Sequence, residues 1–301
     1  MPVLAPEAYL KPDVIRQIQG FDLKAKFVME GFLSGLHKSP FKGFSVEFSE
    51  HRKYVSGDDI RAIDWKVWSR TNRYYVKQYE AETNLTGHLL VDLSGSMGYA
   101  GTPGGITKLE YATYLAGAMA YLMVNQQDPA GLVTFGDEIN QYLKPKCKAS
   151  HLLSILRVLS EAKPQGPTGL ARCLHRIAEM IPHRGLVVLC SDLLDVEEEV
   201  LNAFAHLRYR GHDLIVFQIF DAAEARFPFD RLTRFEDLEG QEESVTAEPA
   251  AIRSAYLAEV RAFLEHYRTE CQKRRVDFVS MDTATSFDKA LLAYLQHRCG
   301  R

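Results

Sequence analysis

Residues 88–97 read HLLVDLSGSM, a short apolar run that ends in an aspartate and is followed by a turn with two serines. An apolar run of this length that ends at a turn is typical of a strand buried in a parallel sheet. We therefore predict a central strand at 88–93. In open parallel sheets, ligands bind beyond the carboxyl ends of the strands, which makes Asp92, Ser94 and Ser96 candidate binding residues.

Strands and helices alternate along the chain after this run. Further strands are predicted at 130–135, 138–143, 186–190, 214–220 and 276–281. Thr107 and Glu110 form a capping box for a first helix, and further helices are predicted at 149–160, 169–181, 196–208, 249–274 and 286–297. This alternation predicts an α/β fold with a doubly wound, mostly parallel sheet. We expect the Leu and Phe positions of the 249–274 helix to lie in the core.

Three regions of the chain differ in pattern. Residues 1–40 are predicted to be a helical N-terminal segment, residues 41–85 a β-rich accessory region, and residues 86–301 the α/β domain. The α/β domain carries an acidic insertion at about 222–250, for which we predict a hairpin around Glu239-Gly240. The accessory region has too little apolar sequence for its own core, so we expect residues 1–85 to wrap the α/β domain.

Polar residues at the predicted strand ends and at one helix start form a candidate metal site. Its members all carry side-chain oxygens: Asp92, Ser94, Ser96, Thr168 and Asp192. Hard cations such as Mg²⁺ prefer oxygen ligands, and Mn²⁺ or Ca²⁺ are alternatives. The lack of His and Cys in the set disfavours zinc and copper. Because several donors are neutral hydroxyls, a bound ion would stay electron-poor and would favour an incoming carboxylate.

Each member of this set also has a plainer explanation. Asp, Ser and Gly dominate turns, so the residues after the first strand could serve the turn alone. Thr168 could cap the helix that follows it. Asp221, which follows the strand at 214–220, is either a turn residue or an additional group beside the metal. The agreement of separate cues at one edge of the sheet favours the metal site.

The motif Asp92-x-Ser94-x-Ser96 resembles the first part of the metal-ion-dependent adhesion site of von Willebrand A domains. Thr168 and Asp192 stand where the other two parts of that site are found, and the order of the predicted elements also resembles that fold. The resemblance implies a protein-interaction module, not an enzyme. A carboxylate of the partner protein would complete the coordination of the ion.

A second resemblance covers nearly the whole chain. The stretches at 43–48 (GFSVEF), 52–54 (RKY), 57–65 (GDDIRAIDW) and 77–82 (KQYEAE) resemble the signature of the bacterial domain-of-unknown-function family 58. In that family the signature precedes a von Willebrand A domain, and members are associated with MoxR-type AAA+ ATPases. The resemblance implies an adaptor or chaperone-like partner of such an ATPase. Many relatives carry a membrane-spanning hairpin ahead of the signature, and the lack of one here implies a soluble form.

The signature is dense in charged and aromatic side chains: Arg52, Asp58, Asp59, Arg61, Asp64 and Trp65. We expect Arg–Asp pairs in this set to hold an irregular β-region against the α/β domain. A surface that contacts the partner is the alternative. Charges of both signs are too evenly mixed here for a nucleic-acid surface.

Composition limits the classes of function. The chain has 301 residues and a formal net charge of −3, so a strong electrostatic role with nucleic acid or anionic lipid is not expected. We find no signal-peptide core and no apolar stretch of membrane-spanning length. The five cysteines form no CxxC pair, which fits a reducing compartment. We therefore expect a cytoplasmic protein.

A serine hydrolase is the main alternative. Ser94-Gly95-Ser96-Met97-Gly98 resembles a degraded G-x-S-x-G elbow, and Asp221 and His297 follow Ser96 in the order of a catalytic triad. Against it, Ser94 replaces the first glycine of the elbow, and the charge of Asp92 would repel an oxyanion. A scaffold that has lost metal binding is a third possibility. No P-loop motif is present, so ATPase activity would belong to the partner.

Overall fold

The computed structural model of the chain describes residues 21, 24–25, 51–53, 74–77, 86–102, 104–240 and 244–287. The chain forms two compact units, one of residues 1–35 with 85–301 and one of residues 36–84. In the smaller unit, β1 (His51–Lys53) pairs antiparallel with β2 (Tyr75–Lys77), and Arg52 lies opposite Val76. The remaining signature residues lie outside the described part of the chain: Asp58, Asp59, Arg61, Asp64 and Trp65. Their role stays a prediction.

A six-stranded sheet forms the centre of the larger unit. Its strands are β3 (Gly87–Asp92), β4 (Ala130–Phe135), β5 (Ile139–Lys146), β6 (Leu186–Ser191), β7 (Asp213–Phe220) and β10 (Asp277–Asp282). Their order across the sheet is β10-β7-β6-β3-β4-β5, and all neighbours run parallel except β4 and β5. This is the strand order of doubly wound folds. It confirms the predicted α/β fold with a doubly wound, mostly parallel sheet and one antiparallel edge strand.

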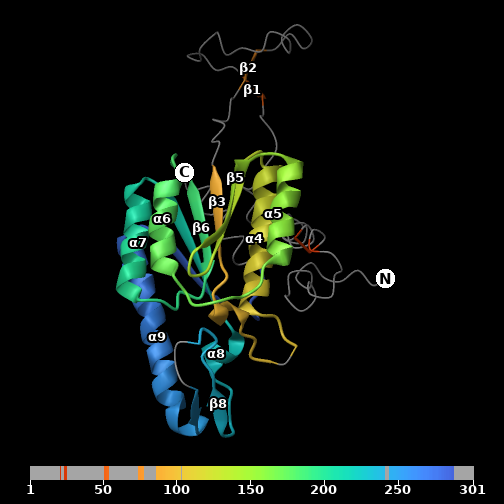
Figure 1. The fold of residues 1–301 in the computed structure, drawn as a ribbon. Coiled ribbons are helices and arrows are strands. Elements are labelled where there is room, and N and C mark those ends of the chain that lie inside the picture. The colour runs from red at the N-terminus through yellow and green to blue at the C-terminus, as the bar shows by residue number, and fades with distance from the viewer. Residues whose placement is uncertain are drawn as a thin grey trace. The chain divides into compact units, whose positions relative to one another are not determined.

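Helices cover both faces of this sheet (Figure 1). The long helices are α4 (Lys108–Asn125), α5 (Ala149–Glu161), α6 (Leu170–Met180), α7 (Glu197–Tyr209) and α9 (Pro249–Lys273). In Figure 1, α4 and α5 lie on one face, and α6 and α7 lie on the other. The predicted capping box at the start of α4 is confirmed, because Glu110 N–H donates to the Thr107 hydroxyl and Thr107 N–H donates to the Glu110 carboxylate.

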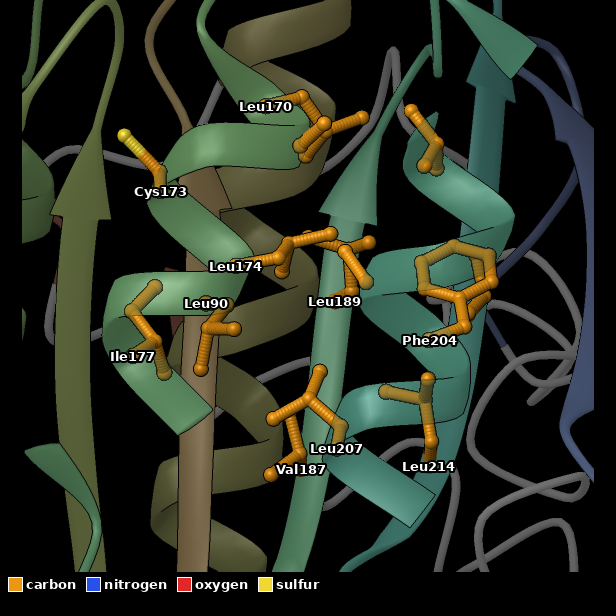
Figure 2. Close-up of a cluster of buried hydrophobic side chains, with 14 of the residues drawn as sticks. Leu90, Leu170, Cys173, Leu174, Ile177, Val187, Leu189, Phe204, Leu207 and Leu214 are labelled. Carbon is orange, nitrogen blue, oxygen red and sulfur yellow. The ribbon is translucent and has the colours of Figure 1, made fainter. Parts of the chain in front are cut away.

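The core on one side of the sheet joins α6 and α7 to the central strands (Figure 2). Leu174 and Ile177 of α6 are fully buried, as are Phe204 and Leu207 of α7. They pack in one cluster with strand residues such as Leu189. Every residue of β3, β4, β6 and β7 is buried. Cover on both faces explains why these strands read as continuous apolar runs and do not alternate.

The prediction that the Leu and Phe positions of the 249–274 helix lie in the core holds only in part, because Phe263 packs against the core cluster but Leu257, Phe263 and Leu264 are all only partly buried. Only Pro249, Tyr267 and Cys271 of α9 are fully buried. The carboxyl-terminal half contributes Tyr267 and Cys271 to the core, whereas the amino-terminal half extends past the end of the sheet (Figure 1). The physical reason is that this half packs on the insertion instead of on the sheet. The predicted helix at 286–297 lies almost entirely outside the described residues.

The insertion is more ordered than its sequence indicated. It contains a short helix, α8 (Ala222–Arg226), and the predicted hairpin, formed by β8 (Thr233–Phe235) and β9 (Val245–Ala247). Ring contacts join these parts to α9: Phe227 lies 4.6 Å from Tyr256 and 5.7 Å from Phe235, between ring centroids. We call α8, the β8–β9 hairpin and the amino-terminal half of α9 the arm.

No helix within the described residues is both long and apolar enough to cross a bilayer.

One buried histidine makes the stability of this fold depend on pH. His88 of β3 is 2% exposed, and its Nδ1 has no hydrogen-bond partner among the described residues. Burial, with a smaller effect of nearby His212, lowers the pKa of His88 from 6.5 to about 4. The unfolded chain therefore takes up a proton near pH 6.5 that the folded chain accepts only near pH 4, so folding loses free energy as the pH falls between these values.

We expect the free energy of unfolding to fall by up to about 3 kcal/mol on this account between pH 7 and pH 4. Urea unfolding at several pH values measures it. His88→Leu should lose part of the decline on acidification, whereas His183→Leu, at an exposed position, should keep it. The same pH dependence in both variants would show that His88 is not its source.

A candidate cation site at the end of the sheet

The candidate residues gather where the direction of chain winding reverses. Strands β3 and β6 are parallel neighbours, but the chain runs from β3 to β4 on one side and from β6 to β7 on the other. In doubly wound sheets this reversal opens a crevice at the carboxyl ends of the two strands. Asp92 is the last residue of β3, and Asp192 directly follows β6. The sheet therefore places the two predicted carboxylates on either side of that crevice.

Asp92 is buried and tightly held at this edge. Its Oδ1 accepts the Ser94 N–H at 2.8 Å, and its Oδ2 accepts the hydroxyl of Ser191 at 2.6 Å. Burial and the nearby charge of Asp192 raise the pKa of Asp92 to about 7, although the hydrogen bonds from Ser191 and Ser94 favour its charged form. Two buried carboxylates that repel one another in this way call for a positive charge between or beside them.

The two serine hydroxyls of the motif lie in the turn that directly follows Asp92. Ser94 Oγ and Ser96 Oγ are 3.1 Å apart, and Ser94 is fully buried whereas Ser96 is half-buried. The loop that carries Thr168 is bonded to the same turn, because Gly95 N–H donates to Gly166 O at 2.9 Å. The structure thus brings the loop of Thr168 to the serine turn, as the sequence predicted.

Thr168 does not cap the following helix. The N-cap of α6 is Gly169, which has no side chain to accept a hydrogen bond from the helix. The carboxylate of Asp195 instead accepts the Ala171 N–H at 3.1 Å. The alternative in which Thr168 serves only as a cap is therefore wrong. Its hydroxyl is not committed to the helix start.

A lysine that we did not single out from the sequence pairs with Asp192. Lys108, the first residue of α4, is completely buried, and its Nζ lies 2.8 Å from both Asp192 Oδ2 and Glu224 Oε1. Burial alone would lower the pKa of Lys108, but the two carboxylates raise it above its usual value, so the ammonium stays charged. The only signal for Lys108 in the sequence was a charged residue at the start of a helix whose other residues are mostly apolar.

A second group missed by sequence analysis comes from the arm. Glu239, in the turn between β8 and β9, accepts the Thr168 N–H on its Oε2 at 2.9 Å. A Cβ on Gly95 would lie 2.4 Å from Leu238 O, which shows how closely the hairpin tip approaches the serine turn. The sequence predicted the hairpin but held no signal for its contact with the site.

Asp221 has a structural role at the start of α8. It is the N-cap of this helix: its Oδ1 accepts the Ala223 N–H at 2.7 Å, and its Oδ2 accepts the Thr283 hydroxyl at 3.0 Å. Both oxygens are thus used by the chain, which supports the turn interpretation over the additional metal group.

The serine hydrolase arrangement does not come together among the described residues. Ser96 Oγ is paired with Ser94 Oγ, and no described histidine hydrogen-bonds to it. Asp221 is occupied as a cap, and His297 lies outside the described part of the chain. A nucleophilic serine needs a base within hydrogen-bond reach, which the described residues do not supply.

The chemistry of the donors fits a hard cation. Asp92 and Asp192 lie at the ends of neighbouring strands, Glu224 shares Lys108 with Asp192, and Glu239 bonds to the loop of Thr168. In the described residues, no group of three or more His, Cys, Asp or Glu side chains is arranged to hold a metal ion. A site of Mg²⁺ type does not need one, because hydroxyls and water supply several of its oxygens.

Comparison with protein families matches residues 50–265 to a family described as "Protein of unknown function DUF58". Uncharacterized proteins of Mycobacterium tuberculosis and Mycobacterium bovis are each 26% identical to this chain over 223 residues, which cover 72% of this chain and 68% of theirs.

Several solved structures are similar at low identity. BatB from Bacteroides thetaiotaomicron gives a TM-score of 0.48 and 13% identity, covering 72% of this chain and 100% of that chain. An aerotolerance-related membrane protein from Bacteroides fragilis has a TM-score of 0.48 and 16% sequence identity. The match covers 71% of this chain and 99% of that chain. The VWA domain of SpRpn10 has a TM-score of 0.37 and 13% sequence identity. The match covers 69% of this chain and 94% of that chain.

The buried ion pairs of Lys108 predict a large effect of removing its charge. Lys108→Met keeps an unbranched apolar stem but leaves Asp192 and Glu224 without a cation, which should lower the free energy of unfolding by about 3–5 kcal/mol. Urea unfolding measures it. Lys163→Met, at an exposed lysine, should change little. Equal stability of the two variants would contradict the role given to Lys108.

Proposed function

This chain belongs to the DUF58 family, and we propose that it is a metal-dependent protein-interaction module, not an enzyme, that acts as an adaptor or chaperone-like partner of a MoxR-type AAA+ ATPase. The partner class comes from the resemblance of the signature stretches to that family. The interaction chemistry comes from the crevice between β3 and β6.

One observation carries the proposal: two mutually repelling buried carboxylates face a turn of hydroxyls at the switch point of the sheet. Burial, and to a smaller extent the charge of Asp192, raises the pKa of Asp92 to about 7, and Lys108 pairs with Asp192. Oxygen donors around excess negative charge suit a divalent cation such as Mg²⁺.

In this proposal the hydroxyls of Ser94, Ser96 and Thr168 hold the ion, and Asp92 and Asp192 hold it by charge or through water. Lys108 takes one oxygen of Asp192 at 2.8 Å, which orients that carboxylate. When bound, the ion would supply an electron-poor position that a partner carboxylate can occupy.

The surface beside the crevice suits a protein partner. Leu194, two residues after Asp192, is 43% exposed, Val196 is 58% exposed, and Leu238 on the hairpin tip is 51% exposed. Exposed apolar side chains next to a charged site are typical of protein–protein contact surfaces. The four described cysteines are free, which supports the further proposal of a cytoplasmic location.

Thermal unfolding tests whether the crevice binds a cation. An ion at about 100 times its dissociation constant should stabilise the fold by roughly 2.7 kcal/mol, which raises the midpoint by several degrees. We expect a rise with Mg²⁺ or Mn²⁺ over EDTA that is reduced in Ser96→Ala. Ser154→Ala, at an exposed helical serine, should keep the full rise. A rise of equal size in both variants would show that the ion binds elsewhere.

A binding assay tests the partner. An immobilised chain should retain a MoxR-type ATPase from the same organism in Mg²⁺ and release it in EDTA, because the ion links the two proteins. Asp92→Asn should retain little ATPase in either buffer. Retention that is insensitive to both EDTA and Asp92→Asn would refute the metal-dependent mode.

A further inference from the structure

The tip of the β8–β9 hairpin lies on the cation crevice. Leu238 O approaches Gly95 so closely that a Cβ there would be only 2.4 Å from it. The next residue, Glu239, accepts the Thr168 N–H at 2.9 Å. The hairpin therefore touches both loops that carry the candidate hydroxyls.

One oxygen of this carboxylate is left over. Glu239 is half-buried, and its Oε1 is shielded from solvent without a hydrogen-bond partner among the described residues. Leaving a carboxylate oxygen buried and unpaired is costly, so in native proteins such an oxygen usually meets a protein group, an ordered water or a ligand. The orphaned oxygen belongs to a side chain whose other oxygen is fixed at Thr168, one of the candidate ligands.

Local contacts fix the backbone at Glu239 and Gly240. Glu239 N–H donates to Asp237 Oδ1 at 2.8 Å, and Gly240 has a φ of 70°, a left-handed conformation that glycine adopts freely. In the hairpin, Phe235 pairs with Val245 and stacks on Phe227, the residue that follows α8. The arm thus holds Glu239 at the crevice by its own packing.

We propose that Glu239 is an intramolecular carboxylate ligand of the cation site. The hairpin tip then fills the position that a partner carboxylate would take, and the partner must displace it to bind. This inference rests on the proposed function, because it needs the crevice to hold a cation.

Because a partner must first displace Glu239, the arm raises the binding free energy that a partner needs. A tethered ligand acts at an effective concentration in the millimolar range, so a partner carboxylate with few other contacts competes poorly with Glu239. A partner that also contacts the exposed Leu238 or Leu194 gains the additional free energy that displacement costs. The arm would thereby favour extended protein partners over free carboxylates.

Mn²⁺ provides the direct test, because its binding and the relaxation of water protons at the bound ion can both be measured. In Glu239→Gln a water should replace the lost carboxylate, so relaxation per bound ion rises and Mn²⁺ affinity falls on the order of tenfold. Added acetate should lower the relaxation of this variant by taking the open position, and should leave the wild type almost unchanged.

Glu236→Gln is the matched control, since Glu236 lies in the same hairpin and is exposed. It should behave as the wild type does. If the wild type binds no Mn²⁺, the proposed function fails and this inference with it. If the wild type binds Mn²⁺ but Glu239→Gln matches Glu236→Gln in affinity and relaxation, the cation site stands and Glu239 is not its ligand.

Amide hydrogen exchange tests the contact without a metal. The Thr168 N–H should be protected in the wild type by its bond to Glu239, and should exchange faster in Glu239→Ala, which removes the acceptor. Glu236→Ala should keep the protection. Thermal unfolding of each variant verifies that it is folded. Equal exchange at Thr168 in all three proteins would place the hairpin away from the crevice and overturn the inference.

Discussion

The buried ammonium of Lys108 joins parts of the larger unit that are distant in sequence. It lies 2.8 Å from Asp192, 84 residues along the chain, and 2.8 Å from Glu224, 116 residues along the chain. It thereby ties the start of α4 to the end of β6 and to α8. Carboxylates are costly to bury unless a positive partner compensates their charge. Lys108 therefore makes the burial of Asp192 and Glu224 possible.

The doubly wound sheet determines where that charge is concentrated. Because β3 and β6 are parallel neighbours with connections that diverge, their carboxyl ends leave a crevice that side chains and loops must line. Asp92 and Asp192 lie on either side of it, and of these two carboxylates Lys108 pairs with Asp192. The resulting excess of negative charge, and the neighbouring hydroxyls of Ser94 and Ser96, together support the interpretation of a cation site.

The insertion links this site to the rest of the surface. Asp221 caps α8, α8 carries Glu224 to Lys108, and the ring of Phe227 just beyond α8 packs on α9 and the hairpin. Through these contacts one segment supplies both a structural carboxylate, Glu224, and a carboxylate at the mouth of the crevice, Glu239. In our proposals, the segment that completes the charge balance also regulates access to the ion.

The sequence by itself determined the strands of the central sheet, its five long helices and the motif residues, because these follow from local signals: apolar runs, capping boxes and polar turns at strand ends. The hairpin and the loop of Thr168 were also predictable, although Thr168 as a cap was not borne out, since Gly169 takes that position. Only the tertiary structure decided the partners of Lys108 and Glu239. Glu239 meets Thr168 across 71 residues, and such pairing depends on how the arm packs, which no local pattern encodes.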